Sequence, residues 1–416
     1  MISAAPTTNA HALAPSLQQK DQDVKRDSFY LPELDGLRTC AFLYVFLFHA
    51  WQIPNAPKFF LCDWYNRFVS FGFTGVDFFF VLSGYLITYL LLKERLIVGS
   101  ISFGMYFRRR MLRIWPLYYL ALFVGAVVLP LCAARHLDWH TYTNFFTQIF
   151  LPMFFWIGNY ALVGCQDALI AFSKCVRFPV ANLFNPLWSV CIEEQFYLTW
   201  PWILKKANSM RLLFLAIGSL TAASIVSRSC FYFAGQHVPS FAHPYYYSTI
   251  SRIDPLMAGA AVAVIQLYLP NLWTTICKYA TPIAACGIVL LLSAISLAPS
   301  ANPQATLLLA PVYCSIALAF GLILAGTIGG SPLKNILSNP WFANPGKITY
   351  GMYVVHHPIM VLTEQYMRQH TSLAYGPLFY LIRTSVSLAL TYAVASLLWK
   401  TYESKFNAMR KRFARV

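Results

Sequence analysis

Charged residues are scarce in this sequence of 416 residues, and that scarcity excludes most soluble folds. Asp, Glu, Lys and Arg make up 11% of the chain, while hydrophobic residues make up 58%. A soluble globular domain carries about 25% charged residues. The long apolar stretches instead predict an all-α fold, a polytopic membrane helix bundle, in place of two or three soluble domains. The ten Cys residues form no CxxC pair and no Cys/His cluster with zinc-like spacing, so no metal site is predicted.

Acidic residues are the scarcer of the two charge types. The chain has 15 Asp and Glu against 31 Lys and Arg, and its formal net charge is +16. A basic excess can indicate nucleic-acid binding. Here the basic residues lie between apolar segments and at the C-terminus, which is typical of cytoplasmic loops in membrane proteins. We therefore expect the protein to interact with the lipid bilayer and not with a nucleic acid.

The ends of the chain differ in composition from its middle. Residues 1–30 are polar and lack the apolar core of a signal peptide. They are expected to form a disordered cytoplasmic tail. A transmembrane domain is predicted over residues 31–400, and residues 401–416 are expected to be a basic cytoplasmic tail. Sustained heptads and repeats of solenoid length are absent, which excludes repeat architectures.

About ten membrane-spanning segments can be laid out on apolarity. They cover approximately residues 36–55, 71–92, 113–131, 187–204, 212–233, 251–269, 280–298, 305–328, 348–366 and 378–399. Under the positive-inside rule this layout places both termini in the cytoplasm. The aromatic stretch 139–186 is predicted to be interfacial or re-entrant on the outer face, because a span there would turn the basic loop KKANSMR outward. Cys165 and Cys175 within it could pair in an oxidising compartment.

The first span contains an Arg and a His in an otherwise apolar run. Arg38 and His49 are eleven residues apart, so they lie within about 20° of one helix face and about 16 Å apart along its axis. Ionisable groups inside a membrane segment are costly and usually functional. Snorkelling to an interface explains Arg38 more readily than His49, because the apolar run continues around the His.

Four further ionisable groups are predicted to share the outer or middle depth of His49: Asp77, Glu193, Asp254 and His356. Asp77 could instead only cap a helix start. Glu193 and its neighbour Glu194 point about 100° apart, so we expect one of them to face the bundle interior. A buried layer of Asp, Glu and His suits chemistry near the outer face, and it also suits the proton relay of a transporter.

A basic cluster lies at the predicted inner end of the third span. In the segment FRRRMLRIWP, Arg109 and Arg113 are four residues apart and Arg110 lies between them, so their guanidinium groups gather at one helix end. Arg forks match the geometry of phosphate groups. A plain positive-inside anchor is the alternative interpretation. Because Arg38 enters the bilayer from the same side, we favour an anionic ligand at the inner face.

The motifs that carry these residues resemble those of the family-three membrane acyltransferases. They are LDGLR…H (34–49), GVDFFFVLSGYLI (75–87), RRMLRIWP (109–116), LWSVCIEEQFY (187–197), RIDPLMAG (252–259) and YGMYVVHHP (350–358). Each motif alone is weak, but six in the right order over residues 31–400 are specific. Two positions depart from the family pattern: Cys191 stands where Ser is common, and His357 stands where an aromatic residue is common.

The resemblance implies an enzyme that O-acylates bacterial surface sugars. Its members have about ten transmembrane helices in the bacterial inner membrane and take an acyl group, most often acetyl, from cytoplasmic acyl-coenzyme A. The donor is thus expected as a co-substrate, with no permanently bound cofactor. The acceptor is expected to be a hydroxyl of a cell-surface or exported carbohydrate such as lipopolysaccharide. Because this sequence lacks the esterase-like domain fused to longer members, separate glycan-assembly proteins are expected as possible partners.

The resemblance also marks individual residues. It implies that Arg38 and His49 are essential and that Arg109, Arg110 and Arg113 hold the donor. We predict that His49 is the general base on the acceptor hydroxyl.

Further residues complete the predicted site. Asp77 or Glu193 would support the imidazolium of His49, while Asp254 and His356 belong to the supporting polar layer. Ser83 and Cys191 are the intramembrane nucleophiles near these motifs that could form an acyl-enzyme. The alternative function is a proton-coupled transporter of an anionic metabolite or a lipid-linked sugar.

Overall fold

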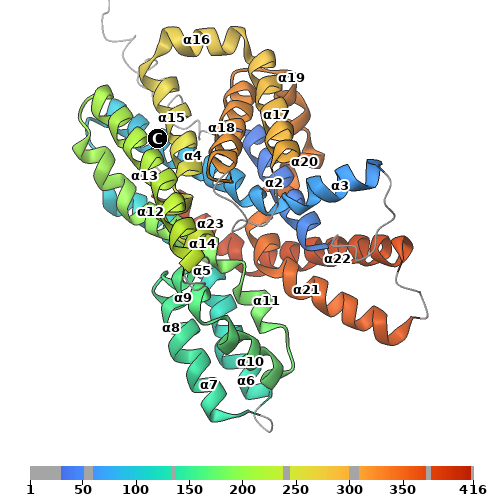
Figure 1. Ribbon diagram of the computed structural model, residues 1–416. Helices are drawn as coiled ribbons and strands as arrows, with labels where there is room; N and C mark the ends of the chain where they lie inside the picture. The colour runs from blue at the N-terminus through green and yellow to red at the C-terminus, as the bar shows by residue number, and fades with distance from the viewer. Residues whose placement is uncertain are drawn as a thin grey trace, which may run out of the picture.

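The fold is all-helical over the part of the chain that the structure describes. This computed structural model describes residues 30–50, 60–133, 137–237, 244–298, 309–371 and 376–413. No strand occurs within these ranges, which confirms the predicted all-α class (Figure 1). The predicted disordered tail, residues 1–30, lies outside the described residues except for Tyr30.

The N-terminal half combines long helices with a run of short ones. They are α2 (Pro32–Ala50), α3 (Phe60–Ser70), η1 (Gly72–Thr74), α4 (Gly75–Val98), α5 (Phe103–Phe123), η2 (Val124–Val128), α6 (Leu129–Cys132), α7 (Trp139–Phe145), η4 (Phe146–Phe150), α8 (Leu151–Phe154), α9 (Gly158–Gly164), α10 (Gln166–Val176), α11 (Val180–Phe184) and α12 (Leu187–Lys206).

The C-terminal half is built from longer helices and a helical tail. They are α13 (Met210–His237), α14 (Pro244–Tyr247), η6 (Ile250–Arg252), α15 (Asp254–Tyr268), α16 (Pro270–Lys278), α17 (Ala280–Leu297), α18 (Leu309–Ile328), α19 (Pro332–Ser338), α20 (Pro340–Gly346), α21 (Thr349–His370), α22 (Pro377–Leu398), η7 (Trp399–Glu403) and α23 (Ser404–Lys411).

Each of the ten predicted spans overlaps a long helix. In the described residues, six helices are long and apolar enough to cross a membrane. A seventh is obtained if α15 and α16, which meet at a bend of 109°, count as one broken span. The helices α2, α12 and α21 do not pass that test, although they contain Arg38, Glu193 and His356. Ten spans and cytoplasmic termini therefore stay predictions.

Helices α4 and α15 pack on each other more extensively than any other pair of helices in the described chain, and Figure 1 shows them side by side. Gly84 on α4 and Gly259 on α15 let the two backbones touch, because a Cβ on Gly84 would lie 2.0 Å from the carbonyl oxygen of Leu256. A Cβ on Gly259 would lie 1.9 Å from the carbonyl oxygen of Val81. Small residues at such crossings are how membrane helices approach closely.

Polar contacts show which helix ends share a side of the bundle. Arg95, near the end of α4, donates hydrogen bonds to the carbonyls of Leu204 and Ala207 after α12 at 2.7 and 2.8 Å. Of these two residues, Leu204 lies in the last turn of α12 and Ala207 follows the helix. Arg95 also donates a hydrogen bond of 2.8 Å to the hydroxyl of Tyr268, the last residue of α15. The C-terminal ends of these three helices therefore lie together, as the predicted alternation of spans requires.

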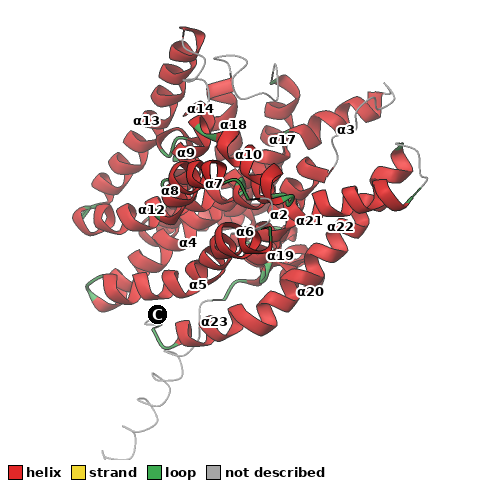
Figure 2. Ribbon diagram, turned by 90° about the horizontal axis from the view of Figure 1, so that it is seen from below, coloured by secondary structure: helices red, strands yellow, loops and turns green. Residues whose placement is uncertain are grey.

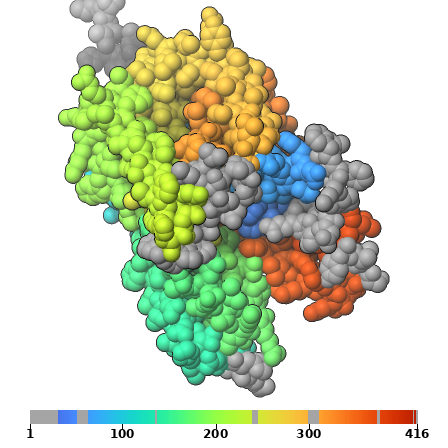
Figure 3. All heavy atoms as spheres, in the orientation of Figure 1, coloured from blue at the N-terminus to red at the C-terminus, as the bar shows by residue number. Residues whose placement is uncertain are grey.

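The segment from α7 to α11 folds into a separate lobe at one end of the molecule (Figures 1 and 3). Its helices are short. Asp138 caps the N-terminus of α7, because its carboxylate accepts a hydrogen bond from the backbone N–H of Thr141 at 2.8 Å. Hydrogen bonds from Thr141 also hold the pKa of Asp138 below its ordinary value. No helix in this fully described segment is long enough to span, so its interfacial or re-entrant position stays a prediction. Cys165 carries a free thiol and is not bonded to Cys175.

Candidate active site

A half-open pocket lies between α2, α4, α5, α12 and α21. It holds about 730 Å³ of empty space, counting its open mouth. Side chains from all five helices line it: Arg38, Val76, Phe79, Phe80, Ser83, Leu86, Arg110, Arg113, Ile114, Ser189, Val190, Glu193, Tyr197, Thr349, Tyr350 and Tyr353. Cationic, acidic and hydroxyl groups therefore meet in one cavity inside the helix bundle.

Three of the four predicted donor-binding Arg residues line this pocket. Arg38 is bonded to Asp35 one turn before it on α2. Arg110 lies over the ring of Tyr197, 4.8 Å from its centroid. Within the described ranges, neither Arg110 nor Arg113 has a carboxylate close enough for an ion pair. The pocket thus holds two guanidinium groups that form no ion pair with any described carboxylate, although Glu193 lines the same cavity.

Arg109 lies outside the pocket lining. Its guanidinium forms an ion pair with Glu94 of α4 at 3.5 Å and donates a hydrogen bond to the carbonyl of Phe413 at 2.8 Å. Adjacent residues on a helix point in different directions, so Arg109 cannot face the pocket beside Arg110. Its contacts tie α5 to α4 and to the end of the chain.

Glu193 is the acidic group of the pocket. Its Oε1 accepts a hydrogen bond from the Ser83 hydroxyl at 2.7 Å, and that hydroxyl accepts one from Tyr197 at 2.9 Å. Glu194 does not line the pocket and accepts a hydrogen bond from the indole N–H of Trp115 at 3.2 Å. Ser83 and Glu193 therefore form a nucleophile-and-base pair of the type that acyl transfer uses.

His49 belongs to a cluster of three imidazoles. Its ring stacks on that of His357 with centroids 4.3 Å apart, and the ring of His356 lies 5.3 Å away. His356 is completely buried and packs against the ring of Phe42 at 5.8 Å. In the described residues, no group of His, Cys, Asp and Glu has a metal-binding arrangement. The helices α2 and α21 thus bring His49 together with His356, one of the groups predicted to share its depth, and add His357.

Hydrogen bonds fix the state of these rings. Nδ1 of His356 lies 2.7 Å from the carbonyl oxygen of Tyr353, which can only accept, so Nδ1 carries the proton. Nε2 of His356 then carries a lone pair, and it is buried with no hydrogen-bond partner. Nε2 of His357 pairs with the amide nitrogen of Asn182 at 2.9 Å, which leaves its buried Nδ1 without a partner.

Tyr353 links the pocket to the imidazole cluster. Its side chain lines the pocket, and its hydroxyl pairs with that of Ser189 at 2.9 Å. The centroid of its ring lies 5.6 Å from that of His356. Tyr353 therefore borders both the pocket and the imidazole cluster.

The predicted partnership of Asp77 with His49 is not found. The Asp77 carboxylate is bound to Arg252 at 2.8 Å, and that guanidinium lies over the ring of Tyr246 at 4.6 Å. Asp254, which lies two residues after Arg252, is bound to Arg228 at 2.8 Å. Helix rise sets the depth of each group, but the packed helix faces decide which groups meet.

Arg228 is the residue that sequence reasoning missed. It is 1% exposed and sits among Asp254, Ser251 and Cys314. An Arg well inside the apolar helix α13, seventeen residues after Arg211 in its first turn, was the signal available, because an intramembrane Arg requires a partner. Asp77 and Asp254 therefore belong to a buried pair of ion pairs and do not line the pocket.

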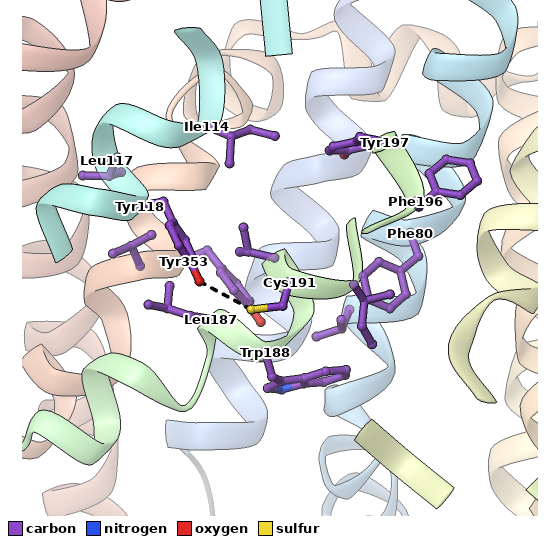
Figure 4. Packing of buried hydrophobic residues seen from close by; sticks show 14 of the residues in the cluster. Phe80, Ile114, Leu117, Tyr118, Leu187, Trp188, Cys191, Phe196, Tyr197 and Tyr353 are labelled. Atoms are coloured by element: carbon purple, nitrogen blue, oxygen red, sulfur yellow. Dashed lines mark hydrogen bonds between the residues drawn. The ribbon is translucent and has the colours of Figure 1, made fainter. Parts of the chain in front are cut away.

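Cys191 does not line the pocket, and Figure 4 shows its sulfur directed toward Tyr118 among buried hydrophobic side chains. Its sulfur lies 3.4 Å from the hydroxyl of Tyr118 on α5, and the side chain is fully buried. Of the two nucleophiles predicted for an acyl-enzyme, only Ser83 lines the cavity.

Comparison with known proteins identifies this set of helices and residues. A family profile described as an acyltransferase domain matches residues 31–400. The chain belongs to this acyltransferase family. Its membership and its apolar helices make it an integral membrane protein.

Three relatives of this acyltransferase illustrate its similarity to known proteins. It is 28% identical over 357 residues to the peptidoglycan O-acetyltransferase OatA of Listeria monocytogenes, covering 80% of this chain and 50% of the relative. It is 30% identical over 345 residues to YrhL of Bacillus subtilis, a provisionally named peptidoglycan O-acetyltransferase, covering 80% and 49%. A provisionally named O-acetyltransferase of Staphylococcus aureus is 27% identical over 355 residues, covering 81% and 52%. The chain spans about half the length of these relatives, and no solved structure matches it.

Proposed function

We propose that this protein is a membrane O-acyltransferase of the bacterial plasma membrane. It moves an acyl group, acetyl in the first instance, from cytoplasmic acyl-coenzyme A to a hydroxyl of a cell-surface or exported carbohydrate. Peptidoglycan is the first acceptor to test, because two relatives are named for it. Lipopolysaccharide and capsular or exported polysaccharides are the next.

The observation that carries this proposal is the position of the pocket. Guanidinium groups and a Ser–Glu pair line the pocket, and Tyr353, which also lines it, lies against the imidazole cluster. A coenzyme A thioester requires groups of these kinds, because it has phosphates at one end and a reactive carbonyl at the end of a long arm. In this proposal Arg38, Arg110 and Arg113 bind the phosphates.

The imidazole cluster supplies the proton transfer. An acceptor hydroxyl that enters the cluster could accept a hydrogen bond from Nδ1 of His357 and direct its single proton to the ring of His49. His49 then takes the hydroxyl proton as the oxygen bonds to the thioester carbon. The carbon–sulfur bond breaks, and coenzyme A leaves as a thiol once the proton has been returned to its sulfur.

The proposal is tested by acyl transfer from radiolabelled acetyl-coenzyme A. Membranes with wild-type protein should label a carbohydrate fraction, and His49→Ala at equal abundance should lower the rate by about two to four orders of magnitude. The same variant should bind coenzyme A as wild type does, because His49 does not line the pocket.

Two results would contradict this assignment. Undiminished transfer by His49→Ala would remove the His from the mechanism. Uptake of an anionic solute by the wild type, without labelled carbohydrate, would favour the transporter.

A further inference from the structure

The C-terminal tail is a helix that is fixed along α5 (Figure 2). At one end the hydroxyl of Tyr402 donates to the carbonyl of Pro116 at 3.2 Å. At the other end the guanidinium of Arg109 donates to the carbonyl of Phe413 at 2.8 Å, and Arg108 lies 5.5 Å from the ring of the same Phe. The tail therefore runs antiparallel to α5 along the face that holds the RRRMLR segment.

This packing against α5 brings one more Arg near the Arg residues of the pocket. Arg410 lies on the last turn of α23, and its charge interacts with those of Arg38, Arg110 and Arg113, which line the pocket. It is half-buried. The sequence prediction treated this part of the chain only as a basic tail.

The acidic groups nearby form no ion pair with Arg110, Arg113 or Arg410 in the described residues. Glu193 lines the pocket, and its charge interacts with those of Arg110 and Arg113, but its Oε1 is hydrogen-bonded to Ser83. Asp35 is bound to Arg38, and Glu94 is bound to Arg109. Glu403 is buried where α23 begins, under Gly351 of α21, and its charge faces Arg113. In the described part of the chain, Arg110, Arg113 and Arg410 each lack a carboxylate within ion-pair distance.

Three guanidinium groups of like charge that lie near each other repel, and this repulsion destabilises the fold unless an anion binds between them. Arg forks bind phosphate oxygens through paired hydrogen bonds, which makes a phosphate-rich ligand the occupant that fits. The buried Oδ1 of Asn407, one turn before Arg410, also has no partner and could accept from a ligand hydroxyl or amine.

We propose that α23 is the closing wall of the donor site and that Arg410 binds a phosphate of the acyl-coenzyme A together with Arg110 and Arg113. This inference rests on the proposed function, since it takes the same donor. It adds a binding residue and gives the C-terminal helix a role in holding the substrate.

The experiment measures binding of coenzyme A to the purified full-length protein in detergent by calorimetry. Arg410→Ala should weaken binding by about tenfold to a hundredfold, in line with the loss of a charge-assisted hydrogen bond, and Arg113→Ala should weaken it similarly. Arg410→Lys should restore part of the affinity. Arg412→Ala, two residues further along the tail and exposed, should bind as wild type does.

Pantetheine, which has no phosphate, separates a phosphate contact from general damage. Its weak binding should be the same in wild type and Arg410→Ala, and the two proteins should unfold at the same temperature. Wild-type affinity of Arg410→Ala for coenzyme A would overturn this inference alone. Failure of the wild type to bind coenzyme A would overturn the proposed donor as well, so the two failures are distinguishable.

Discussion

Ser83 is a single residue whose position decides between two routes for the acyl group. Its hydroxyl lies in the pocket between the Glu193 carboxylate and the Tyr197 phenol. A direct transfer needs Ser83 only to hold Glu193, whereas a covalent route uses its oxygen as the nucleophile. Cys191, the other nucleophile considered, is enclosed by Tyr118 and Met153.

We expect Ser83→Ala to lower acyl transfer by at least about tenfold, because either role removes a hydrogen bond to a charged group. Cys191→Ala should keep transfer within about twofold. The rates are measured with acetyl-coenzyme A in membranes of equal protein content. Mass spectrometry of the wild type, incubated without acceptor, should show the label on the Ser83 peptide only if the route is covalent. Loss of transfer in Cys191→Ala together with normal transfer in Ser83→Ala would contradict the structure.

The residues of the site were partly predictable from sequence, for a physical reason. Residue number multiplied by helix rise gives depth, so the sequence predicted that Arg38 lies at the opposite end of α2 from His49. Depth does not tell which side of a helix faces which neighbour. The sequence therefore predicted the wrong partner for Asp77, which binds Arg252 and not His49. His356 was correctly grouped with His49 because α21 packs on α2.

At the scale of elements, the crossing of α4 and α15 holds the site together. Helix α4 carries Ser83, and α15 begins at Asp254, so the crossing connects the pocket to the buried ion pairs. The two Gly residues at the crossing leave no room for a side chain on either helix. The helices themselves were predictable from apolar runs. Their crossing was not, because it depends on contact between residues far apart in sequence.

Substitution of Gly259 tests this crossing. Gly259→Ala forces Cβ toward the carbonyl of Val81 and should destabilise the protein by about 1–3 kcal/mol through displacement of the helices. Gly218→Ala on α13 is the matched control. Its Cβ meets nothing within 4 Å, and Ala favours the helix by up to about 1 kcal/mol. Thermal unfolding in detergent measures both, and equal melting temperatures for the two variants would show that the crossing is not tight.

The whole molecule is expected to carry out its reaction across the bilayer. The ends of α4, α12 and α15 gather around Arg95, on the side where the basic pocket mouth is predicted to open to the cytoplasm. The lobe of α7 to α11 is predicted to lie on the other side. The number of spans is not established, because α2, α12 and α21 carry polar groups of the site and are therefore not apolar enough to be recognised as spans.

Epitope insertion tests this orientation. An epitope inserted after Gly99, in the turn that follows α4, should be detected only in permeabilised spheroplasts. An epitope after Arg177, in the turn between α10 and α11, should be detected in intact ones. Both turns have left-handed backbone and lie between helices, so insertions there should be tolerated. Detection of both epitopes from one side would overturn the alternating layout.

The packing around His356 has an electrical consequence. Rings of Phe42 and Phe46 enclose this imidazole, and its side chain has no exposed surface. In the proposed reaction, an acyl group at this site is always bonded to a sulfur or an oxygen atom, or is being transferred from one to the other. It therefore needs no water around it. Hydrated ions would have to shed their water to follow the same route. We therefore expect that acylation of outer carbohydrates with a cytoplasmic donor does not let ions leak through the protein and leaves the membrane potential unchanged.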